Sequence, residues 1–366
     1  MAKIGIDFRS ACTSRKTGKG WYTYRMVKVL LEVDLQNEYR LYVNRGDLPE
    51  DFAIPDGAVA KICVINSNPL LWHFRVIADL KKECIKTFWA PSSFIIPAFL
   101  PNTINSIITI HDLVAFLFPK THQFKATVME KLFLKKALNK TSKAVCVSEN
   151  TRRDLVRLFD FPKEKTSVIP LAPAIVENSG EAESTEMTKR LPHIATGNYI
   201  LAVGTVEPRK NFGTAIAAFR KLRTQHHDLS LLIVGGKGWK EHIGEEDGVA
   251  LLGYIAEPEL FALYKNARAL VFPSLYEGFG LPPLEAMALG CPVVCSDTSS
   301  LPEVVGDAAI MCDPMNVDAI FNALSKILTD DALRHELIAK GHAQAAKFSW
   351  KKSAEELRDI INAVAL

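Results

Sequence analysis

The sequence predicts an α/β protein of two domains, each with a mainly parallel sheet and helices on both faces. Three observations predict this fold class. Short apolar runs alternate with helical patterns along the chain, as in parallel sheets. The alternation stops in a polar segment, 174–198, and starts again at Tyr199. The length of 366 residues suits two hydrophobic cores better than one.

In the amino-terminal half, apolar runs predict a series of strands. They cover Lys3–Phe8, Tyr39–Val43, Ala60–Ile65, Thr87–Ala90, Ser106–Ile110 and Lys143–Val147. A helix is predicted from about Trp21 to Val33, after a glycine-containing loop. Ser148 stands where the helix after the last of these strands needs a cap, because a serine side chain accepts from the first-turn N–H groups.

The carboxyl-terminal half repeats this organisation. Its predicted strands are Tyr199–Val203, Leu229–Val234, Val249–Leu252, Ala269–Phe272, Val293–Ser296 and Ala308–Cys312. Helices are predicted over Asn211–Thr224 and Ser349–Val364. The segment 174–198 is rich in Glu, Ser and Thr and predicts a linker or surface loop. We therefore expect domains at 1–173 and 199–348 and a terminal helix at 349–366.

Composition excludes several protein classes. A hydrophobic content of 48% and a charged content of 23% are typical of ordinary globular proteins. No apolar run reaches the roughly 18 residues of a membrane span, and the first residues carry no signal region. We expect a cytoplasmic location, in peripheral contact with the inner face of the plasma membrane. The seven cysteines are scattered and do not form a zinc-binding pattern.

Positive charge is concentrated in the amino-terminal half. Residues 1–170 hold 26 Lys and Arg against 16 Asp and Glu, and the remainder holds 18 against 25. No aromatic-interleaved basic motif accompanies the excess, so we expect no nucleic-acid partner.

The segment 120–143 carries seven lysines and one glutamate. Its predicted apolar face consists of Phe124, Val128, Leu132 and Leu138. Two interpretations stay open: a helix packed on the core with its lysines in water, or a basic amphipathic helix on an anionic membrane near a lipid-phosphate acceptor.

The most informative segment runs from Glu277 to Glu285 and reads EGFGLPPLE. Glu277 follows the predicted strand Ala269–Phe272, and open α/β sheets bind ligands at the carboxyl ends of their strands. Glu285 falls in the first or second turn of a helix predicted over Pro283–Leu289. Between the two carboxylates, glycines permit close approach and helix-start amides attract phosphate. The candidate ligand contacts there are Gly278, Phe279, Gly280 and Leu281.

The longer run from Pro273 to Val294, PSLYEGFGLPPLEAMALGCPVV, resembles the signature of retaining glycosyltransferase family 4. The resemblance implies the GT-B fold, in which two doubly wound Rossmann-like domains face an interdomain cleft, and a nucleotide-activated sugar as donor. It implies that Glu277 contacts the donor sugar and Glu285 the ribose. It also implies that the terminal helix crosses back to the first domain.

The first loop, with Gly18 and Gly20, lies between the first strand and the first helix. Many first loops need glycine merely to turn. The position matches the family's glycine-rich loop, which faces the donor phosphates, and the resemblance therefore implies a donor contact here. The dinucleotide pattern G-x-G-x-x-G is absent, which disfavours a Rossmann dehydrogenase.

Two adjacent cations, Arg209 and Lys210, follow the first strand of the second half within VGTVEPRKN. Such a pair is suited to neutralising a departing diphosphate, and a surface charge pair is the alternative. Family members commonly have an arginine directly after the glycine, where this chain has Thr205. We expect Arg209 to supply the missing charge, as in a mannosyltransferase-like branch with an EPRKN run.

His111 and Tyr254 complete the candidate site. His111 follows the predicted strand Ser106–Ile110, where the family places a histidine near the transferred sugar and the acceptor. Asp112 is predicted to orient that ring or to cap the next element. Tyr254 precedes a helix start and is predicted either to line the base pocket or to be part of the core.

No Asp-x-Asp motif occurs in the chain. Metal-dependent sugar transferases of another fold use that motif to hold a divalent ion, so we expect no metal and no cofactor beyond the donor substrate. Catalytic roles fall to Arg209, Lys210, Glu277 and His111.

The EPRKN run and the later LPEV segment resemble bacterial mannosyltransferases of surface polysaccharide synthesis, including lipopolysaccharide. The resemblance favours GDP-mannose as donor and a glycan or lipid-linked glycan as acceptor. A UDP-sugar-dependent transferase and a catalytically silent nucleotide-sugar binder are the alternatives.

Overall fold

The computed structural model describes residues 1–13, 16, 18–44, 48–49, 51–119, 124–174, 197–236, 238, 243 and 246–365, with the backbone alone for residues 70 and 124–126. The chain divides into two compact units. Unit 1 comprises Met1–Leu171 and Ser349–Leu366, and unit 2 comprises Ala172–Phe348. Most of the predicted linker 174–198 lies outside the described residues.

Unit 1 is built on a parallel sheet in the order β3-β2-β1-β4-β5-β6-β7. Its strands are β1 (Lys3–Asp7), β2 (Glu38–Val43), β3 (Val59–Val64), β4 (Thr87–Ala90), β5 (Asn105–Ile110), β6 (Thr141–Cys146) and β7 (Thr166–Val168). Its helices are α1 (Gly18–Val33), α2 (Pro69–Lys82), α3 (Ile95–Phe99), α4 (Val114–Leu117), α5 (Phe124–Leu138), α6 (Glu149–Phe159) and α15 (Trp350–Ala365), with short 3-10 turns at Arg9–Cys12 and Lys163–Lys165.

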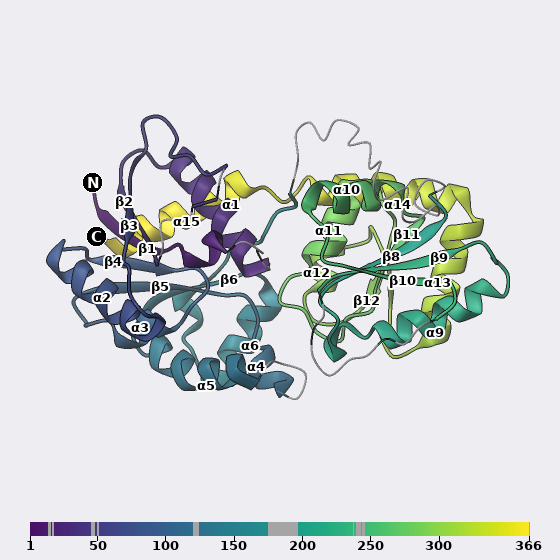
Figure 1. The fold of residues 1–366 in the computed structure, drawn as a ribbon, viewed down its shortest axis with the longest axis horizontal. Coiled ribbons are helices and arrows are strands. Elements are labelled where there is room, and N and C mark those ends of the chain that lie inside the picture. The colour runs from purple at the N-terminus through teal and green to yellow at the C-terminus, as the bar shows by residue number, and fades with distance from the viewer. Residues whose placement is uncertain are drawn as a thin grey trace. The chain divides into compact units, whose positions relative to one another are not determined.

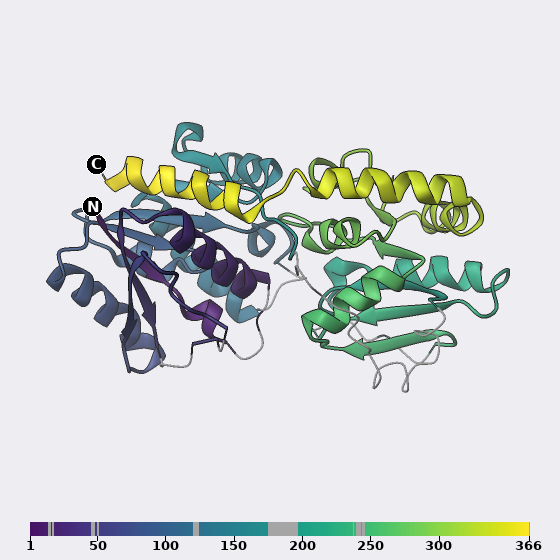
Figure 2. The same cartoon turned by 90° about the horizontal axis from the view of Figure 1, so that it is seen from above.

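Helices cover both faces of this sheet (Figure 1). The helices α2, α3, α5 and α6 lie on one face, where their apolar side chains form one core cluster with the strands. On the other face, α1 packs against α15, and the two run side by side in Figure 2. The side-chain amides of Asn37 and Asn362 join the start of β2 to α15 at 2.7 Å. The carboxyl-terminal helix is thus part of unit 1.

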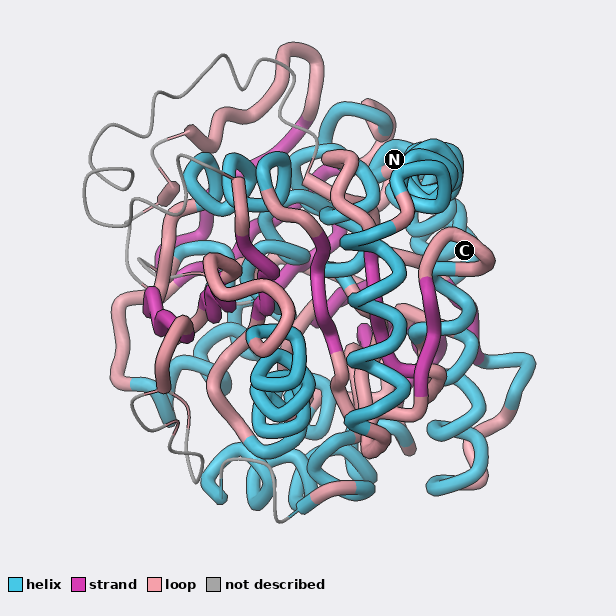
Figure 3. Tube along the Cα trace, turned by 90° about the vertical axis from the view of Figure 1, so that its right-hand side faces the viewer, coloured by secondary structure: helices cyan, strands magenta, loops and turns pink. Residues whose placement is uncertain are grey.

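Unit 2 contains a second parallel sheet in the order β10-β9-β8-β11-β12-β13. Its strands are β8 (Tyr199–Val203), β9 (Ser230–Val234), β10 (Val249–Gly253), β11 (Ala269–Phe272), β12 (Val293–Ser296) and β13 (Ile310–Cys312). Its helices are α9 (Phe212–Arg223), α10 (Glu257–Asn266), α11 (Leu281–Ala288), α12 (Leu301–Val305), α13 (Val317–Thr329) and α14 (Asp331–Ala345), with a 3-10 turn at Pro208–Lys210. In Figure 3 the helices are cyan and the strands are magenta.

The predicted fold class of two doubly wound α/β domains is confirmed. Local chemistry explains several element boundaries. The Ser148 hydroxyl accepts from the Thr151 N–H at 3.0 Å and caps α6, as predicted. Gly290 has a φ of 76° just after the end of α11, a conformation that suits glycine. The short edge strand β7 was not predicted, because three residues are too few to show an alternating or continuous pattern of apolar side chains.

Two predictions about helices are wrong. The helix α1 begins at Gly18, three residues before the predicted start, so its glycines lie in the first turn. In α5, Phe124, Val128, Leu132 and Leu138 were predicted to form one apolar face, either on the core or on a membrane. Leu138 is buried, whereas Leu132 is 62% exposed and Val128 is exposed as well, so these residues do not share one face. The buried positions of α5 are Thr127, Leu134, Ala137 and Leu138, and the side chain of Phe124 lies outside the described set. A lysine-rich helix has apolar residues on more than one face, and the sequence pattern alone does not select among them.

Candidate functional site

The best-formed candidate site of unit 2 lies where its strand order reverses. The first strand, β8, pairs with β9 on one side and with β11 on the other. In doubly wound sheets, ligands bind at the carboxyl ends of the two strands that flank this point. The loops after β8 and β11 hold the predicted donor residues Arg209, Lys210 and Glu277, and the structure brings these side chains together.

The carboxylate of Glu277 contacts both cations. Its Oε1 accepts from Lys210 Nζ at 2.6 Å and lies 2.9 Å from Arg209 Nη1. Arg209 also donates through Nη1 to the Tyr276 carbonyl oxygen and through Nη2 to Oε1 of Glu207, each at 2.5 Å. Two cations and two carboxylates are therefore packed together, and their formal charges balance.

Glu207 is a site residue that the sequence did not reveal. Only 5% of it is exposed, and its carboxylate fixes the far side of the Arg209 guanidinium. A glutamate two positions before an arginine carries no signal of such pairing by itself. The 3-10 turn at Pro208–Lys210, which Pro208 begins, turns the Arg209 side chain back toward Glu207.

Burial and charge act in opposite directions on this cluster. Burial lowers the pKa of Lys210, and the neighbouring Arg209 lowers it further, although the Glu277 carboxylate opposes both. Burial alone would raise the pKa of Glu277, but Arg209 and Lys210 outweigh it, and that pKa is lowered. Glu277 is consequently ionised at neutral pH and holds the cations in place.

The backbone of the Glu277 loop is held by the segment after β12. The Glu277 N–H donates to the Ser299 hydroxyl at 2.9 Å. The Ser300 hydroxyl lies within hydrogen-bond distance of the carbonyl oxygens of Glu277, at 3.0 Å, and Phe279, at 2.5 Å. The sequence does not indicate either serine, because hydroxyls in a loop are common and the two loops become neighbours only in the folded sheet.

The loop then leads into α11. Phe279 is buried and packs edge-on against Phe348, with ring centroids 5.8 Å apart. Gly280 precedes Leu281, the first residue of α11. The next two residues are prolines without an N–H, so Leu281 is the one residue among the first three of the helix whose backbone N–H can bind an anion.

Glu285 lies in the second turn of α11 and is 7% exposed. Its Oε2 accepts from the Tyr264 hydroxyl at 3.4 Å. Burial and the Glu285 charge raise the pKa of Tyr264 well above its ordinary value, so this hydroxyl keeps its proton. Tyr264 on α10 thus supports Glu285 from the side of the core, a partner that the sequence did not indicate.

Tyr254 follows Gly253 at the carboxyl end of the edge strand β10. Its side chain is 51% exposed, so the alternative that placed it in the core is wrong. The ring therefore lies partly in solvent at this edge of the sheet, which is compatible with the other alternative, a place beside the base.

In unit 1, the first turn of α1 lies against the 3-10 turn after β1. A Cβ on Gly20 would come 2.6 Å from the Ser10 carbonyl oxygen, so glycine is needed there for packing. A Cβ on Gly18 would meet nothing within 4 Å. Of the two predicted glycines, Gly18 therefore has space beside its backbone for a ligand.

His111 follows β5 and is half-buried. One ring nitrogen, Nε2, lies 2.7 Å from the Pro91 carbonyl oxygen, and the ring stands edge-on to Tyr22 with centroids 4.7 Å apart. Burial lowers the pKa of His111 to about 4, and the nearby Lys19 charge adds to this effect. Asp112 accepts from the Val114 N–H at 3.1 Å and caps α4, which was one of its two predicted roles.

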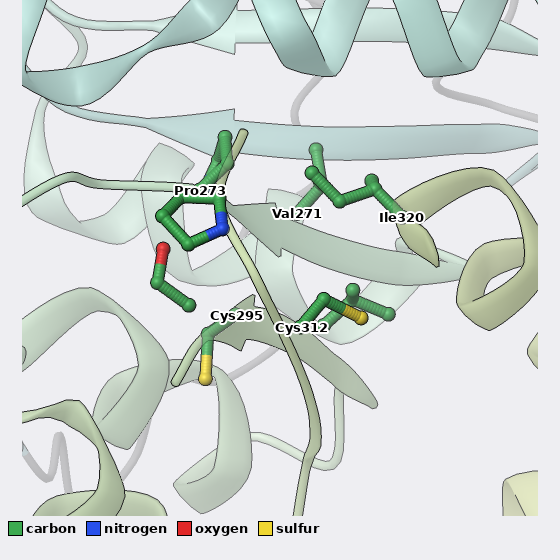
Figure 4. Close-up of a pocket in the computed structure, with 8 residues that line it drawn as sticks. Val271, Pro273, Cys295, Cys312 and Ile320 are labelled. Atoms are coloured by element: carbon green, nitrogen blue, oxygen red, sulfur yellow. The ribbon is translucent and has the colours of Figure 1, made fainter. Parts of the chain in front are cut away.

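A narrow apolar pocket lies between β11, β12, β13 and α13 of unit 2 (Figure 4). It is lined by Val271, Pro273, Cys295, Cys312 and Ile320, among others. Burial raises the pKa of the Cys295 thiol, which makes it a packing residue at neutral pH. This pocket is part of the core. Within the described ranges, no group of three or more His, Cys, Asp or Glu side chains is arranged to hold a metal ion.

Comparison with known proteins identifies the family. A profile for glycosyl transferases group 1 matches residues 183–344, and one for glycosyltransferase family 4 matches residues 18–172. O-antigen chain mannosyltransferase B of Escherichia coli is 36% identical over 357 residues, which make up 92% of this chain and 93% of that protein. The chain belongs to the family 4 glycosyltransferases.

Solved structures of low identity share the fold of this glycosyltransferase. Sucrose-phosphate synthase from Thermosynechococcus elongatus matches with a TM-score of 0.75 at 18% identity, over 100% of this chain and 99% of the other. Anabaena HepE in complex with UDP-glucose matches with a TM-score of 0.76 at 15% identity, over 99% and 100% of the two chains. The predicted GT-B class is confirmed.

The glycosyltransferase needs a glycine at position 204. Gly204 has a φ of 149°, and a Cβ there would come 2.9 Å from Cε of Lys210. We expect Gly204→Ala to displace the Lys210 side chain and to reduce sugar transfer at least tenfold, since loss of one preorganised donor costs about 10²–10³ in rate. Initial rates of transfer measure the effect.

Gly213→Ala is the matched control, because a Cβ on Gly213 in α9 would meet nothing within 4 Å. Alanine also favours a helix over glycine. Equal activity of the two variants would show that the position of Lys210 does not depend on Gly204.

The lowered pKa of His111 makes the stability of the glycosyltransferase depend on pH. Between about pH 4 and the ordinary histidine pKa of about 6.5, the unfolded chain binds a proton that the folded chain does not. Stability is therefore complete above this window and falls as the pH falls through it. From pH 7 to pH 5 we expect a loss of about 1 kcal/mol from this residue, allowing for its contact with water.

Urea unfolding at pH 7 and pH 5 measures this loss, and His111→Gln removes the titrating group. The variant should lose about 1 kcal/mol less than the wild type between the two pH values. An identical pH dependence of the two proteins would contradict the burial of a neutral imidazole.

Proposed function

We propose that this glycosyltransferase transfers mannose from GDP-mannose to a hydroxyl of a glycan or lipid-linked glycan, with retention of anomeric configuration. The observation that carries the proposal is the buried cluster of Arg209, Lys210 and Glu277 beside the strand reversal of unit 2. The similarity of the whole chain to O-antigen chain mannosyltransferase B supports mannose as the transferred sugar and a growing polysaccharide as the acceptor.

In this proposal, the bond between the sugar C1 and the diphosphate oxygen breaks while C1 bonds to the acceptor oxygen. The diphosphate oxygen takes the acceptor proton. Arg209 and Lys210 stabilise the negative charge that develops on the diphosphate. The backbone amides near Gly18 and Leu281 add donors to the phosphates.

The remaining residues hold the substrates. Glu277 binds sugar hydroxyls, Glu285 binds the ribose, and Tyr254 stacks on the base. His111 shapes the sugar and acceptor side of the reaction, and its low pKa keeps the ring neutral at physiological pH. No metal ion takes part, and the enzyme acts in the cytoplasm.

Calorimetric titration of the full chain with GDP, UDP, ADP and their sugar conjugates, first without metal and then with Mn²⁺, tests the donor. Selective binding of GDP and GDP-mannose without metal is the expected result. Binding that requires Mn²⁺ would overturn the metal-independent part of the proposal. Absence of any nucleotide binding by a folded sample would overturn the site itself.

A UDP-sugar is the alternative donor. The similarity in fold to HepE, which was solved with UDP-glucose, keeps this alternative in the test. Selective UDP binding would leave the family and the site in place and would replace GDP-mannose as the donor.

A further inference from the structure

The outer surface of unit 1 has one face with an unusual combination of exposed apolar and basic side chains. It is formed by α2, α3 and α5, which lie on the same face of the sheet, with α3 packed against both of the others (Figure 1). We call this the α2–α3–α5 face. It lies on the opposite side of the sheet from α1 and α15.

Large apolar side chains point outward along two helices of this face. Leu71 and Phe74 of α2 are 50% and 51% exposed, and Leu132 of α5 is 62% exposed. Val128 and Met129, one turn before Leu132, are exposed as well. Single exposed apolar residues are normal, but five of them on two helices joined by a third mark an interaction surface.

Aromatic contacts make the patch continuous. The ring of Phe99 on α3 lies between Phe74 on α2 and Phe133 on α5, with centroid distances of 5.3 Å and 5.7 Å. The exposed residues of α2 and α5 therefore border one packed aromatic row and do not form separate patches.

The charged residues of this face are mostly basic. Lys131, Lys135 and Lys136 are exposed on α5, in the turns that also expose Leu132. The Nζ of Lys136 lies 3.9 Å from the centroid of the Phe99 ring. The single acidic residue between positions 128 and 140, Glu130, is half-buried and lies 3.5 Å from Lys19 Nζ. Exposed Arg75, Lys81 and Lys82 extend the positive charge along α2.

We infer that the α2–α3–α5 face binds the surface of a membrane rich in anionic phospholipids. Apolar side chains that enter the acyl boundary, flanked by lysines that reach the headgroups, are the arrangement by which helices lie on such a surface. Exposed basic residues flank the apolar row on both α2 and α5, and an anionic lipid surface matches both the positive charge and the exposed apolar side chains. In the part of the chain that the structure describes, no helix is long and apolar enough to cross a membrane.

The inference goes beyond the proposed sugar transfer and does not require it. The exposed residues of unit 1 carry it, so a different donor would leave it unchanged. It gives a physical reason why an enzyme acting on a lipid-linked acceptor would carry its positive charge in unit 1.

Co-sedimentation of the full chain with vesicles of phosphatidylcholine, with and without phosphatidylglycerol, tests the inference. We expect binding to the anionic vesicles that exceeds binding to phosphatidylcholine at least tenfold and weakens as NaCl rises, because salt screens the lysines. Leu132→Gln and, separately, Lys131→Glu with Lys135→Glu should each weaken binding about tenfold or more.

Matched controls lie elsewhere on unit 1. Leu35 lies two residues after the end of α1 and is 53% exposed, so Leu35→Gln makes the same chemical change as Leu132→Gln outside the α2–α3–α5 face. Lys351→Glu with Lys352→Glu changes two exposed lysines of α15, on the other side of the sheet. Vesicle binding by these controls should stay within about twofold of the wild type. Nucleotide binding in solution should be unchanged in all four variants, which separates this test from that of the donor.

Equal binding to both kinds of vesicle, or equal loss in the variants and their controls, would overturn the inference. Sedimentation velocity adds a second outcome. If the wild type were a dimer and Leu132→Gln a monomer, the face would be an interface between two copies of the chain, and the membrane assignment would be wrong.

Discussion

Replacement of Lys210 by alanine should reduce sugar transfer about 100-fold or more while the protein stays folded. The lysine is 90% buried on its side chain and lies within 2.6 Å of the Glu277 carboxylate, so its ammonium group is held in place before the donor arrives. A fixed cation in a site shielded from water stabilises the departing diphosphate far more than a mobile one, and loss of such a donor costs about 10²–10³ in rate. Steady-state transfer rates at saturating donor measure the loss.

Lys221→Ala is the matched control for this prediction. Lys221 lies in the same unit on α9, and its ion pair with Asp318 is exposed to solvent. Exposed ion pairs contribute little to stability, so this variant should retain wild-type transfer. Comparable transfer by Lys210→Ala and Lys221→Ala would remove Lys210 from the proposed mechanism.

The sequence predicted the strands of both sheets well, because the interior strands of a parallel sheet are short continuous apolar runs. The strands Thr87–Ala90, Tyr199–Val203, Ala269–Phe272 and Val293–Ser296 were predicted with the bounds that the structure shows. The sequence left the orientation of α5 open, because its apolar residues fit either a core-packed helix or a helix on a membrane. Leu132 fits an apolar periodicity, but Leu134 and Ala137 form the face that packs on the sheet.

The candidate site could be predicted only in part. Arg209, Lys210, Glu277 and Glu285 were singled out by their places after predicted strands and at a helix start, and a family resemblance implied their roles. Neither source supplies their contacts. Loops that follow different strands meet because of the order of those strands in the sheet. That order determines the pairing of Glu277 with both cations and the contacts that Glu207 and Ser300 make with the site. A local stretch of sequence therefore does not indicate these contacts.

The contacts of Glu277 also lead to a second prediction, in which binding and transfer change in opposite directions. In the donor-free protein, the charges of Arg209 and Lys210 are balanced by Glu277 and Glu207. A diphosphate must therefore compete with Glu277 for the same two cations. Glu277→Gln keeps the shape of the side chain and removes one negative charge, which leaves the cluster with a formal charge of +1.

We expect Glu277→Gln to bind GDP at least as tightly as the wild type and to transfer sugar about 100-fold more slowly. Binding of GDP is retained because the Glu277 carboxylate no longer neutralises the two cations. The substitution also removes a negative charge that would repel the negatively charged diphosphate. Transfer falls because the carboxylate that orients the sugar and fixes both cations is lost. The variant should also be less stable by about 3 kcal/mol, since breaking a buried ion pair leaves a charge uncompensated.

Calorimetry with GDP, transfer rates and urea unfolding measure the three effects on one sample. Glu246→Gln is the control, because Glu246 pairs with Arg220 at the surface of the same unit, where removal of the charge should change none of them. Weaker GDP binding together with slower transfer would mean that Glu277 supports the diphosphate site as a whole. Tighter or equal GDP binding with slow transfer instead assigns Glu277 to the sugar. In the free enzyme, Glu277 competes with the diphosphate for Arg209 and Lys210. It can therefore lower the barrier to transfer only after the bound diphosphate has replaced it as the partner of these two cations.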